Sequence, residues 1–586
     1  MTSIDDIFKK PSHPSNSKRK LEPTRDPTEI YKAAKLGANG DAKSSKDATV
    51  EDEDENDIAG PELPPDFEED IPDDEEGRFF GGGVTKDTTN ALDFVDKHEE
   101  EGAAVQVVDS AWLRRAALNF EKKISKNAEL RVKFENDPQK FMASEADLDV
   151  DIKALSILSE HPRLYGEFAE LGCVGSLVSL LTHENTDIAI DAIEILGELI
   201  DEDVEAEENQ WDALANSMLD SDVLELLSQN LARLDEDNEA DRSGIYHILN
   251  VLESLASRPS IADRIGQESD IMPWLHERIS KKETRVSQNK QYSAEMLAIL
   301  LQSSSKNRLR FIGLNGVDTL LQLLSVYRKL DPQKDSDEEE YFENLFDCLT
   351  CVVDEDEGKD KFIEAEGIEL GQIMLREGTL SKPRALRVLN HALGGRGGSR
   401  ACEHFVEAGL LRTIFGIFMK KDILQQENAF TEHVLGIFSS LLRLLPGDSA
   451  GRIRTLAKFV EKDYEKVTRL VKLRRDYKSK ISVVEQSIAQ EQKHLGQDDQ
   501  DAMAGEWLSR RLDAGLFSLQ SIDVILAWLV AEDDGAKAKV GSLMVDQDED
   551  LSGIRATLQE QLSGLDDSEV DYQDTKDMLN TLMSFL

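Results

Sequence analysis

Carboxylates at helical spacing are the residues in this sequence whose types and positions could do chemistry. One series follows steps of four, three, four and three residues: Asp187, Asp191, Glu194, Glu198 and Asp201. These steps place the series on one face of a helix. A second series, at steps of three, four and seven residues, consists of Glu340, Glu343, Asp347 and Asp354.

Like charges at these spacings repel one another by about 0.2–0.5 kcal/mol per pair. A helix face that keeps them has two interpretations. It is a solvated outer face in an acidic protein, or it is a groove that attracts cations. Under the second interpretation we predict that both series bind Lys/Arg-rich peptides.

No residue set in the sequence predicts catalysis or a cofactor. Cys348 and Cys351 form a CxxC pair, but no second Cys pair or His pair supplies the remaining ligands of a zinc site. The glycines between 394 and 398 neither follow a strand nor precede Gly-Lys-Ser/Thr, so they predict a loop rather than a phosphate cradle. The ten histidines form no HExxH motif. We therefore predict a protein that is not an enzyme and holds no metal or cofactor.

Two basic segments stand out against the acidic background. Lys18, Arg19 and Lys20 form a cluster that predicts a nuclear localisation signal. The stretch 452–480 contains eleven Lys and Arg against four acids. It either contacts RNA phosphates or an acidic protein, or it pairs with acids of this chain, and the sequence leaves these alternatives open.

The overall composition narrows the class of partner. The chain has 586 residues and a formal net charge of −49, which favours basic protein partners over nucleic acids and anionic membranes. We expect no direct nucleic-acid contact and no membrane insertion, because no run of 18 apolar residues occurs. Four cysteines provide no disulfide framework, which is typical of a reducing compartment. We expect a soluble intracellular protein.

A recurring pattern indicates the elements that position the carboxylates. Short apolar helical runs begin near Val174, Val223, Ile271, Val317, Ile368 and Leu410, most of them behind a Gly or Asp. In five of the six copies a longer apolar helix follows, and a shorter one follows the copy at Ile368. A period in the forties with two or three helices per unit is typical of armadillo and HEAT repeats. Such units stack because one unit cannot bury its own apolar face.

These patterns predict an all-α armadillo/HEAT-like right-handed superhelical solenoid. Residues 1–105 are predicted to be a disordered tail, first basic and then acidic, with two apolar islands at Ile4–Phe8 and Phe79–Gly83 that are either docking motifs or incidental. We predict a helical N-terminal cap over 106–165, about six repeats over 166–446, and a helical C-terminal module over 447–586. In that module we expect a long helix from about Arg452 to Leu495 and three further helices, over Trp507–Val530, Gly535–Leu562 and Ser568–Leu586.

Several short segments resemble the beta-catenin-like protein 1 family, and in particular its fungal members. The matching segments are Asn119–Lys123, Glu129–Phe134, Asn136–Pro138, Lys140–Met142, His183–Asp187, Glu343–Asp347, Leu411–Phe415 and Arg510–Phe517. The resemblance covers roughly residues 110–586, whereas the N-terminal tail matches only in kind.

The resemblance implies a nuclear scaffold protein in pre-mRNA splicing. It implies association with the spliceosomal NineTeen complex and binding of nuclear localisation signals on splicing factors, including the cell-division-cycle-five-like protein. An alternative is a nuclear import adaptor of the importin type. Importin grooves carry a ladder of Trp and Asn that we do not find here, which disfavours the adaptor.

Overall fold

The protein is all-helical wherever its structure is described. The computed structural model describes residues 107–268, 270–420, 428–546, 549–566 and 572–586. Within them the chain forms 26 α-helices, six short 3-10 helices and no β-strand, which confirms the predicted all-α class. The tail 1–105, its basic cluster Lys18–Lys20 and its islands Ile4–Phe8 and Phe79–Gly83 lie outside the described residues.

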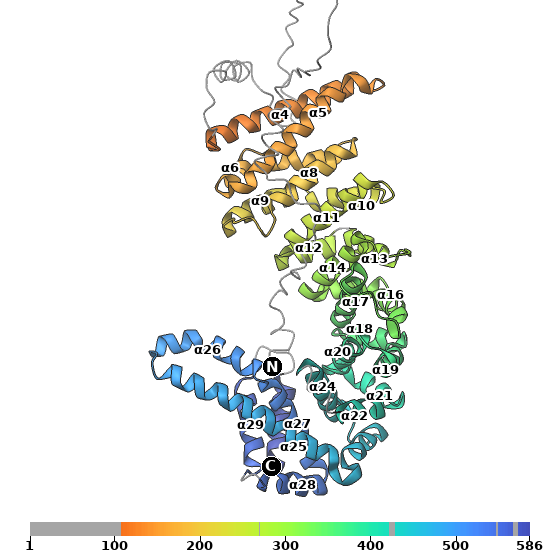
Figure 1. Ribbon diagram of the computed structural model, residues 1–586, viewed down its shortest axis with the longest axis vertical. Helices are drawn as coiled ribbons and strands as arrows, with labels where there is room; N and C mark the ends of the chain where they lie inside the picture. Colours follow the sequence, from red (N-terminus) through yellow and green to blue (C-terminus); the bar gives the residue numbers. More distant parts are fainter. Residues whose placement is uncertain (1–106, 269, 421–427, 547–548, 567–571) are drawn as a thin grey trace, which may run out of the picture. The chain divides into compact units, whose positions relative to one another are not determined.

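The helices fall into two compact units, one up to Ser254 and one from Leu255 onward, and Figure 1 labels most of them. The helices that begin in the first unit are α4 (Ser110–Lys133), η1 (Pro138–Lys140), α5 (Met142–Ala154), η2 (Leu155–Glu160), η3 (Pro162–Leu164), α6 (Tyr165–Glu170), α7 (Cys173–Ser179), η4 (Leu180–Thr182), α8 (Thr186–Leu199), α9 (Glu208–Asp220), α10 (Val223–Arg233) and α11 (Glu239–Ala256).

The helices of the second unit continue the same alternation of short and long elements. They are α12 (Pro259–Glu268), α13 (Ile271–Ser280), α14 (Gln288–Ser303), α15 (Ser305–Gly313), α16 (Gly316–Leu324), η5 (Ser325–Arg328), α17 (Asp337–Val352), α18 (Asp356–Glu364), α19 (Gly367–Glu377), α20 (Ser381–Leu393), η6 (Arg396–Gly398), α21 (Ser399–Glu407), α22 (Leu410–Phe418), α24 (Asn428–Leu444), α25 (Ala450–Gln492), α26 (Gln497–Asp513), α27 (Leu516–Glu532), α28 (Asp534–Val545), α29 (Ser552–Ser563) and α30 (Tyr572–Phe585).

Helices recur in triplets of two short helices and one longer helix. The triplets are α6–α7–α8, α9–α10–α11, α12–α13–α14, α15–α16–α17, α18–α19–α20 and α21–α22–α24. The middle helices begin within one residue of the six starts that the sequence pattern marks. The predicted right-handed superhelix and the predicted boundaries at 106, 166 and 447 stay predictions.

A left-handed residue joins the first and second helix in five of the six triplets. These residues are Gly172 (φ 77°), Asp222 (φ 58°), Asn315 (φ 64°), Glu366 (φ 58°) and Gly409 (φ 79°). The third triplet differs, since Asp270 has a φ of −81°. A left-handed residue reverses the chain without a longer loop, and glycine and short polar residues enter this region most readily. This explains Gly172, Asp222 and Gly409, whereas Gly316 and Gly367 are required for space, since a β-carbon there would lie 2.2 Å from Phe311 Cε1 and 2.3 Å from Phe362 Cδ2.

The long helix that we predicted from about Arg452 to Leu495 corresponds to α25, but it is not continuous. Helix α25 is interrupted at Glu461–Tyr464, where three consecutive residues have left-handed backbones. Contacts from α28 and the residue before it hold the break: the Tyr464 hydroxyl donates to Asp533 Oδ1 at 3.0 Å, and Lys539 Nζ lies 3.2 Å from Asp463 Oδ2. The bend is therefore a product of tertiary contacts.

Two of the three helices that we predicted after α25 are divided more finely, and the third, Ser568–Leu586, corresponds to α30 in its described part. The predicted helix Trp507–Val530 breaks before α27, where Gly515 has a φ of 97°. A β-carbon at Gly515 would lie 2.3 Å from Tyr477 Cδ1, so glycine is required there for space as well as for conformation. The predicted helix Gly535–Leu562 is two helices, α28 and α29.

Strain at the left-handed joints predicts opposite effects for two substitutions. Glu366→Gly should raise the free energy of unfolding by up to about 1 kcal/mol, because a non-glycine residue in this region costs roughly 1–2 kcal/mol and the greater unfolded-state entropy of glycine offsets part of the gain. Gly409→Ala should lower it by about 1–2 kcal/mol. Urea unfolding followed by circular dichroism measures both changes. If both variants change the free energy of unfolding in the same direction, the backbone conformation at the joint does not determine the effect.

Candidate protein-binding surface

Four members of the first carboxylate series lie on α8, which packs between α5 and α11 (Figure 1), and Asp201 lies two residues beyond the end of this helix. The helix begins at Thr186, since Asn185 Oδ1 caps it by accepting a hydrogen bond from the Asp187 amide at 3.1 Å. Close approach to α11 is visible at Gly197, where a β-carbon would lie 3.1 Å from Asn250 Nδ2. Asp187 is exposed, whereas the other four acids are half-buried because neighbouring helices flank them.

Asp191 is engaged with two residues of α5. Lys153 Nζ lies 3.3 Å from Asp191 Oδ1 and 2.5 Å from Asp149 Oδ1. Burial and a hydrogen bond with Asp149 raise the pKa of Asp191 to about 8, while hydrogen bonds to Asp191 and Lys153 outweigh burial and lower the pKa of Asp149. The two carboxyls thus retain about one proton near neutral pH, and Lys153 offsets their remaining charge. Asp191 therefore contributes little to the negative electrostatic potential of this helix face.

The next acids along α8 have no such compensation. Within the described residues no lysine or arginine forms an ion pair with Glu194, Glu198 or Asp201. His247 Nε2 lies 3.9 Å from Glu194 Oε1, but burial lowers the pKa of this histidine, so the ring is neutral near pH 7.

Burial raises the pKa values of Glu198 and Asp201, the last two acids of the series. One buried oxygen of Glu198, Oε2, accepts no hydrogen bond from the described residues. The charges of Asp203 and Glu253 also raise the pKa of Asp201. Uncompensated, partly desolvated carboxylates form a strong local field for a cation. We call Glu194 and Glu198 of α8, together with Asp201 just beyond its end, the acidic face of α8.

The second carboxylate series lies on α17 and is largely matched by bases of α20. Arg384 forms an ion pair with Glu343, and Arg387 forms one with Asp347. Beyond the end of α17, His391 Nδ1 lies 2.9 Å from Asp354 Oδ1. These contacts form a ladder between the long helices of two neighbouring triplets. Our prediction that Glu340, Glu343 and Asp347 bind peptides stays a prediction, but two of these acids already have cationic partners.

Three of the eleven bases in the stretch 452–480 are buried, namely Arg452, Lys466 and Arg474, and most of the others are exposed. Arg452 is 2% exposed and donates from Nε to Glu532 Oε2 at 3.1 Å. Arg474 Nε lies 2.6 Å from the fully buried Asp523, and Lys478 Nζ lies 2.6 Å from Glu549 Oε1. Of the alternatives left open by the sequence, pairing with acids of this chain holds for these residues.

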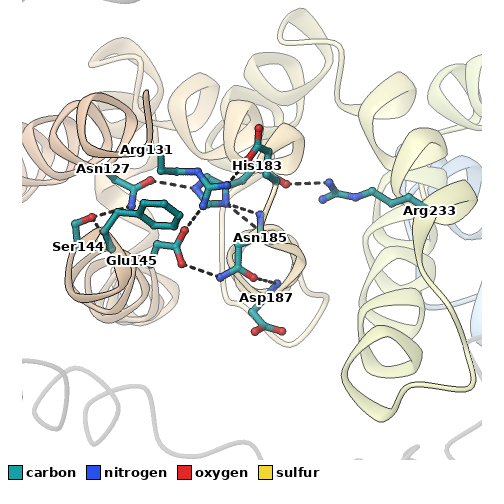
Figure 2. Close-up of polar contacts among 10 residues, drawn as sticks. Asn127, Arg131, Ser144, Glu145, His183, Asn185, Asp187 and Arg233 are labelled. Carbon is teal, nitrogen blue, oxygen red and sulfur yellow. Dashed lines mark hydrogen bonds and ion pairs between the residues drawn. The ribbon is translucent and has the colours of Figure 1, made fainter. Parts of the chain in front are cut away.

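Polar side chains join the cap helices α4 and α5 to the start of α8 (Figure 2). His183 Nε2 and Asn127 Oδ1 are 3.1 Å apart, and Asn185 Nδ2 donates to Glu145 Oε2 at 3.2 Å. Arg131 forms ion pairs with Glu145 and Glu184. We call these residues the cap junction. The sequence analysis includes Arg131 and His183–Asn185 only within segments of family resemblance and singles out neither Asn127 nor Glu145, because residues 127 and 183 are too far apart in the chain for spacing to reveal the contact.

The comparisons with known proteins agree with this architecture. A model of the family described as "Catenin-beta-like, Arm-motif containing nuclear" matches residues 89–559. The chain belongs to this family. Similar relatives are the beta-catenin-like protein 1 homolog of Schizosaccharomyces pombe, 38% identical over 86% of this chain and 87% of that protein, and beta-catenin-like protein 1 of Mus musculus, 40% identical over 72% and 76%.

Family membership confirms the predicted relationship and the armadillo-type fold class. The family is a nuclear one by its description, and it indicates an armadillo scaffold with no catalytic family attached. Among solved structures, an engineered protein aligns with a TM-score of 0.45 at 15% identity over 74% of this chain and 95% of that one. A designed armadillo repeat protein aligns with a TM-score of 0.35 at 14% identity, over 46% and 99%.

The remaining sequence candidates have structural places in the family fold. Cys348 is buried in α17, and burial raises the pKa of Cys351 to about 12, so that thiol stays protonated. The glycine-rich segment forms the turn between α20 and α21, with Gly395 at φ 67°. In the described part of the chain no cluster of three metal-ligating side chains occurs, and no single helix is long and apolar enough to cross a bilayer.

The raised pKa of Asp191 predicts a pH-dependent stability effect. The folded chain holds this proton more tightly than the unfolded chain, so stability falls as pH rises from 3.8 towards 8. Asp191→Asn removes the ionisation and should raise the melting temperature more at pH 8 than at pH 5. Asp187→Asn, on the exposed turn of the same helix, is the control. A gain for Asp191→Asn that does not change with pH would contradict the assignment.

Proposed function

We propose that this protein is a non-enzymatic nuclear scaffold that binds Lys/Arg-rich segments of splicing factors on the acidic face of α8. The observation that supports the proposal is the absence of a compensating base beside Glu194, Glu198 and Asp201 among the described residues. A lysine or arginine of a partner would supply the missing charge, in a place where flanking helices reduce screening by water. Armadillo stacks present such long surfaces to extended peptides.

The family supports the cellular part of the proposal. A nuclear Arm-motif family and the segments shared with beta-catenin-like protein 1 support association with the spliceosomal NineTeen complex, with the cell-division-cycle-five-like protein among the partners. Lys18, Arg19 and Lys20 are proposed to be the signal for the protein's own nuclear import. The second series, Glu340, Glu343 and Asp347, takes a smaller part in peptide binding, because Arg384 and Arg387 neutralise two of its members.

The positions of the tryptophans disfavour the import-adaptor alternative. The five tryptophans belong to α4, α9, α13, α26 and α27. None belongs to the long third helix of a triplet, where an importin-type groove places its Trp and Asn ladder. Peptide recognition therefore rests on carboxylates more than on aromatic slots.

Neutralising the acidic face of α8 should weaken binding of a basic peptide. The combined variant Glu194→Gln, Glu198→Gln and Asp201→Asn keeps side-chain size and removes three charges. Three pairs of roughly 0.2–1 kcal/mol each predict a loss of affinity of about tenfold. Fluorescence anisotropy with a labelled peptide bearing a Lys/Arg cluster measures the change, and wild-type affinity should fall steeply with added salt.

A matched control separates local binding from net charge. Glu170→Gln, Asp220→Asn and Glu225→Gln also remove three negative charges, but from exposed positions on α6, α9 and α10. This variant should retain nearly wild-type affinity. If both variants lose affinity equally, the peptide responds to overall charge and the acidic face is a solvated surface.

Lys153 should act as an internal competitor for the same surface. Its ammonium already neutralises Asp149 and Asp191, as a peptide lysine would. Lys153→Gln should increase affinity for the basic peptide about two- to fivefold, which corresponds to one exposed ion pair. Lys126→Gln, which removes an exposed charge from α4, should have little effect. No gain over this control would show that Asp191 lies outside the peptide path.

A further inference from the structure

Six bases lie on three neighbouring helices of the unit that begins at Leu255, and we call them the basic track. Helix α22 packs against both α19 and α25. Five members of the track are exposed and one, Arg469, is half-buried. The members are Arg376 on α19, Arg412 on α22, Lys420 two residues beyond the end of α22, and Arg469, Lys472 and Arg475 on α25.

Two hydrogen bonds connect the parts of the track. Arg376 Nε of α19 donates to Thr413 Oγ1 of α22 at 3.3 Å, and Thr413 follows Arg412 in the chain. Arg469 Nη2 of α25 donates to the carbonyl oxygen of Lys420 at 3.3 Å. The bases of α19 and α25 therefore meet those of α22 near its two ends, and the six side chains form one surface that crosses three helices.

The exposed side of α22 between these contacts is open and carries no acid. Gly416 lies four residues from both Arg412 and Lys420, so the three positions share one side of the helix. No atom from outside the helix lies within 4 Å of the position of a β-carbon at Gly416. Helix α22 contains no Asp or Glu. An extended chain has room to lie along this side.

The track has no carboxylate partner among the described residues. The acids of α19 are already engaged, because Glu369 lies 2.8 Å from a histidine of α21 and Glu377 lies 2.6 Å from Lys329 Nζ. On α25 the exposed Glu465 and Asp476 lie on either side of the three bases, and neither forms an ion pair with them. Six bases thus accompany two unpaired acids in a chain whose formal net charge is −49.

Arg469 is a partly desolvated cation without an opposite charge beside it in the described part of the chain. Its guanidinium lies 5.5 Å from the centre of the Phe418 ring, and its Nε is buried without a hydrogen-bond acceptor. Burial lowers the pKa of this group, because the charged form loses water. Its hydrogen bond goes to the neutral carbonyl of Lys420. Such a cation attracts an anion more strongly than a fully hydrated one does.

We propose that the basic track is the docking site of the acidic segment 51–76 of the same chain. This segment contains fifteen Asp and Glu and no Lys, Arg or His. The other parts of the chain outside the described residues contain no acidic run of this length. Four prolines, at positions 61, 64, 65 and 72, disfavour a helix and favour an extended chain, which suits a track that crosses three helices.

The tether favours this segment over a polyanion from solution. Residues 77–106 separate it from Val107, and these thirty residues extend to roughly 100 Å, which is long enough to reach helices far from α4. A segment of the same molecule binds with an effective concentration that a partner in solution must exceed. RNA, which the sequence left open for the stretch 452–480, is also repelled by the net charge of the chain.

Photo-crosslinking in the full-length chain tests the proposal. Phe67→benzoylphenylalanine places an aromatic reporter within the acidic segment and should crosslink, within one molecule, to α19, α22 or α25. Tyr31→benzoylphenylalanine, in the basic part of the tail, is the control and should give about tenfold less of these crosslinks. Mass spectrometry identifies the linked peptides. A crosslink to other helices, a crosslinked dimer, or a yield no higher than that of the control would overturn the proposal.

Two sets of exposed bases provide matched variants for the Phe67 reporter. Arg412→Gln, Lys472→Gln and Arg475→Gln together remove three charges from the track and should reduce the crosslink yield about tenfold. Lys282→Gln, Arg285→Gln and Lys334→Gln remove three charges from exposed positions outside the track and should leave the yield nearly unchanged. Circular dichroism checks that both variants fold. Equal yields in the two variants would show that the segment does not occupy the track.

A competing polyanion tests the choice of occupant. An equimolar short oligouridylate should leave the wild-type crosslink yield nearly unchanged, because the tethered segment has the higher effective concentration. Added salt should lower the yield, since the contact depends on charge. Loss of the crosslink on addition of the oligonucleotide would show that RNA is the preferred occupant of the track and would contradict the proposal.

Discussion

The loss of water around ionisable groups on the packed long helices is the constraint on which the rest of this structure depends. Helix α8 packs against α5 and α11, and α17 packs against α14 and α20. A carboxylate that loses water must gain a proton, gain an opposite charge, or remain uncompensated and able to attract a cation. All three outcomes occur in this chain, and each has a different consequence for function.

The contrast between α8 and α17 shows how neighbours decide the outcome. Asp191 meets both Lys153 and Asp149, so it retains a proton and loses its field. Glu343 and Asp347 meet two arginines of α20, which converts an acidic stripe into a ladder between triplets. Glu194 and Glu198 meet no such base in the described residues. Although the two stripes have similar spacing, only the one on α8 keeps an uncompensated charge.

The same rule governs the C-terminal unit with the signs reversed. Arg452 and Arg474 are almost fully buried, and each has a carboxylate partner, Glu532 and Asp523. Such pairs are specific in geometry, and removing one partner leaves a buried charge whose cost exceeds the value of the pair. They fix α25 against α27 across the bend at Glu461–Tyr464. The basic stretch is therefore partly structural, although its composition also suits an anionic partner.

The sequence by itself determined the helical class, the starts of the six middle helices and the family. These depend on local properties: apolar periodicity, left-handed joints at residues such as Gly172 and Gly409, and short shared segments. Only the tertiary structure decided which charges are compensated, where α25 bends, and that the segments around Asn127 and His183 form the cap junction. The physical reason is that charge compensation and the bend in α25 depend on contacts between residues far apart in the chain, 38 positions for Lys153 and Asp191 and 69 for Tyr464 and Asp533, which spacing along one helix cannot reveal.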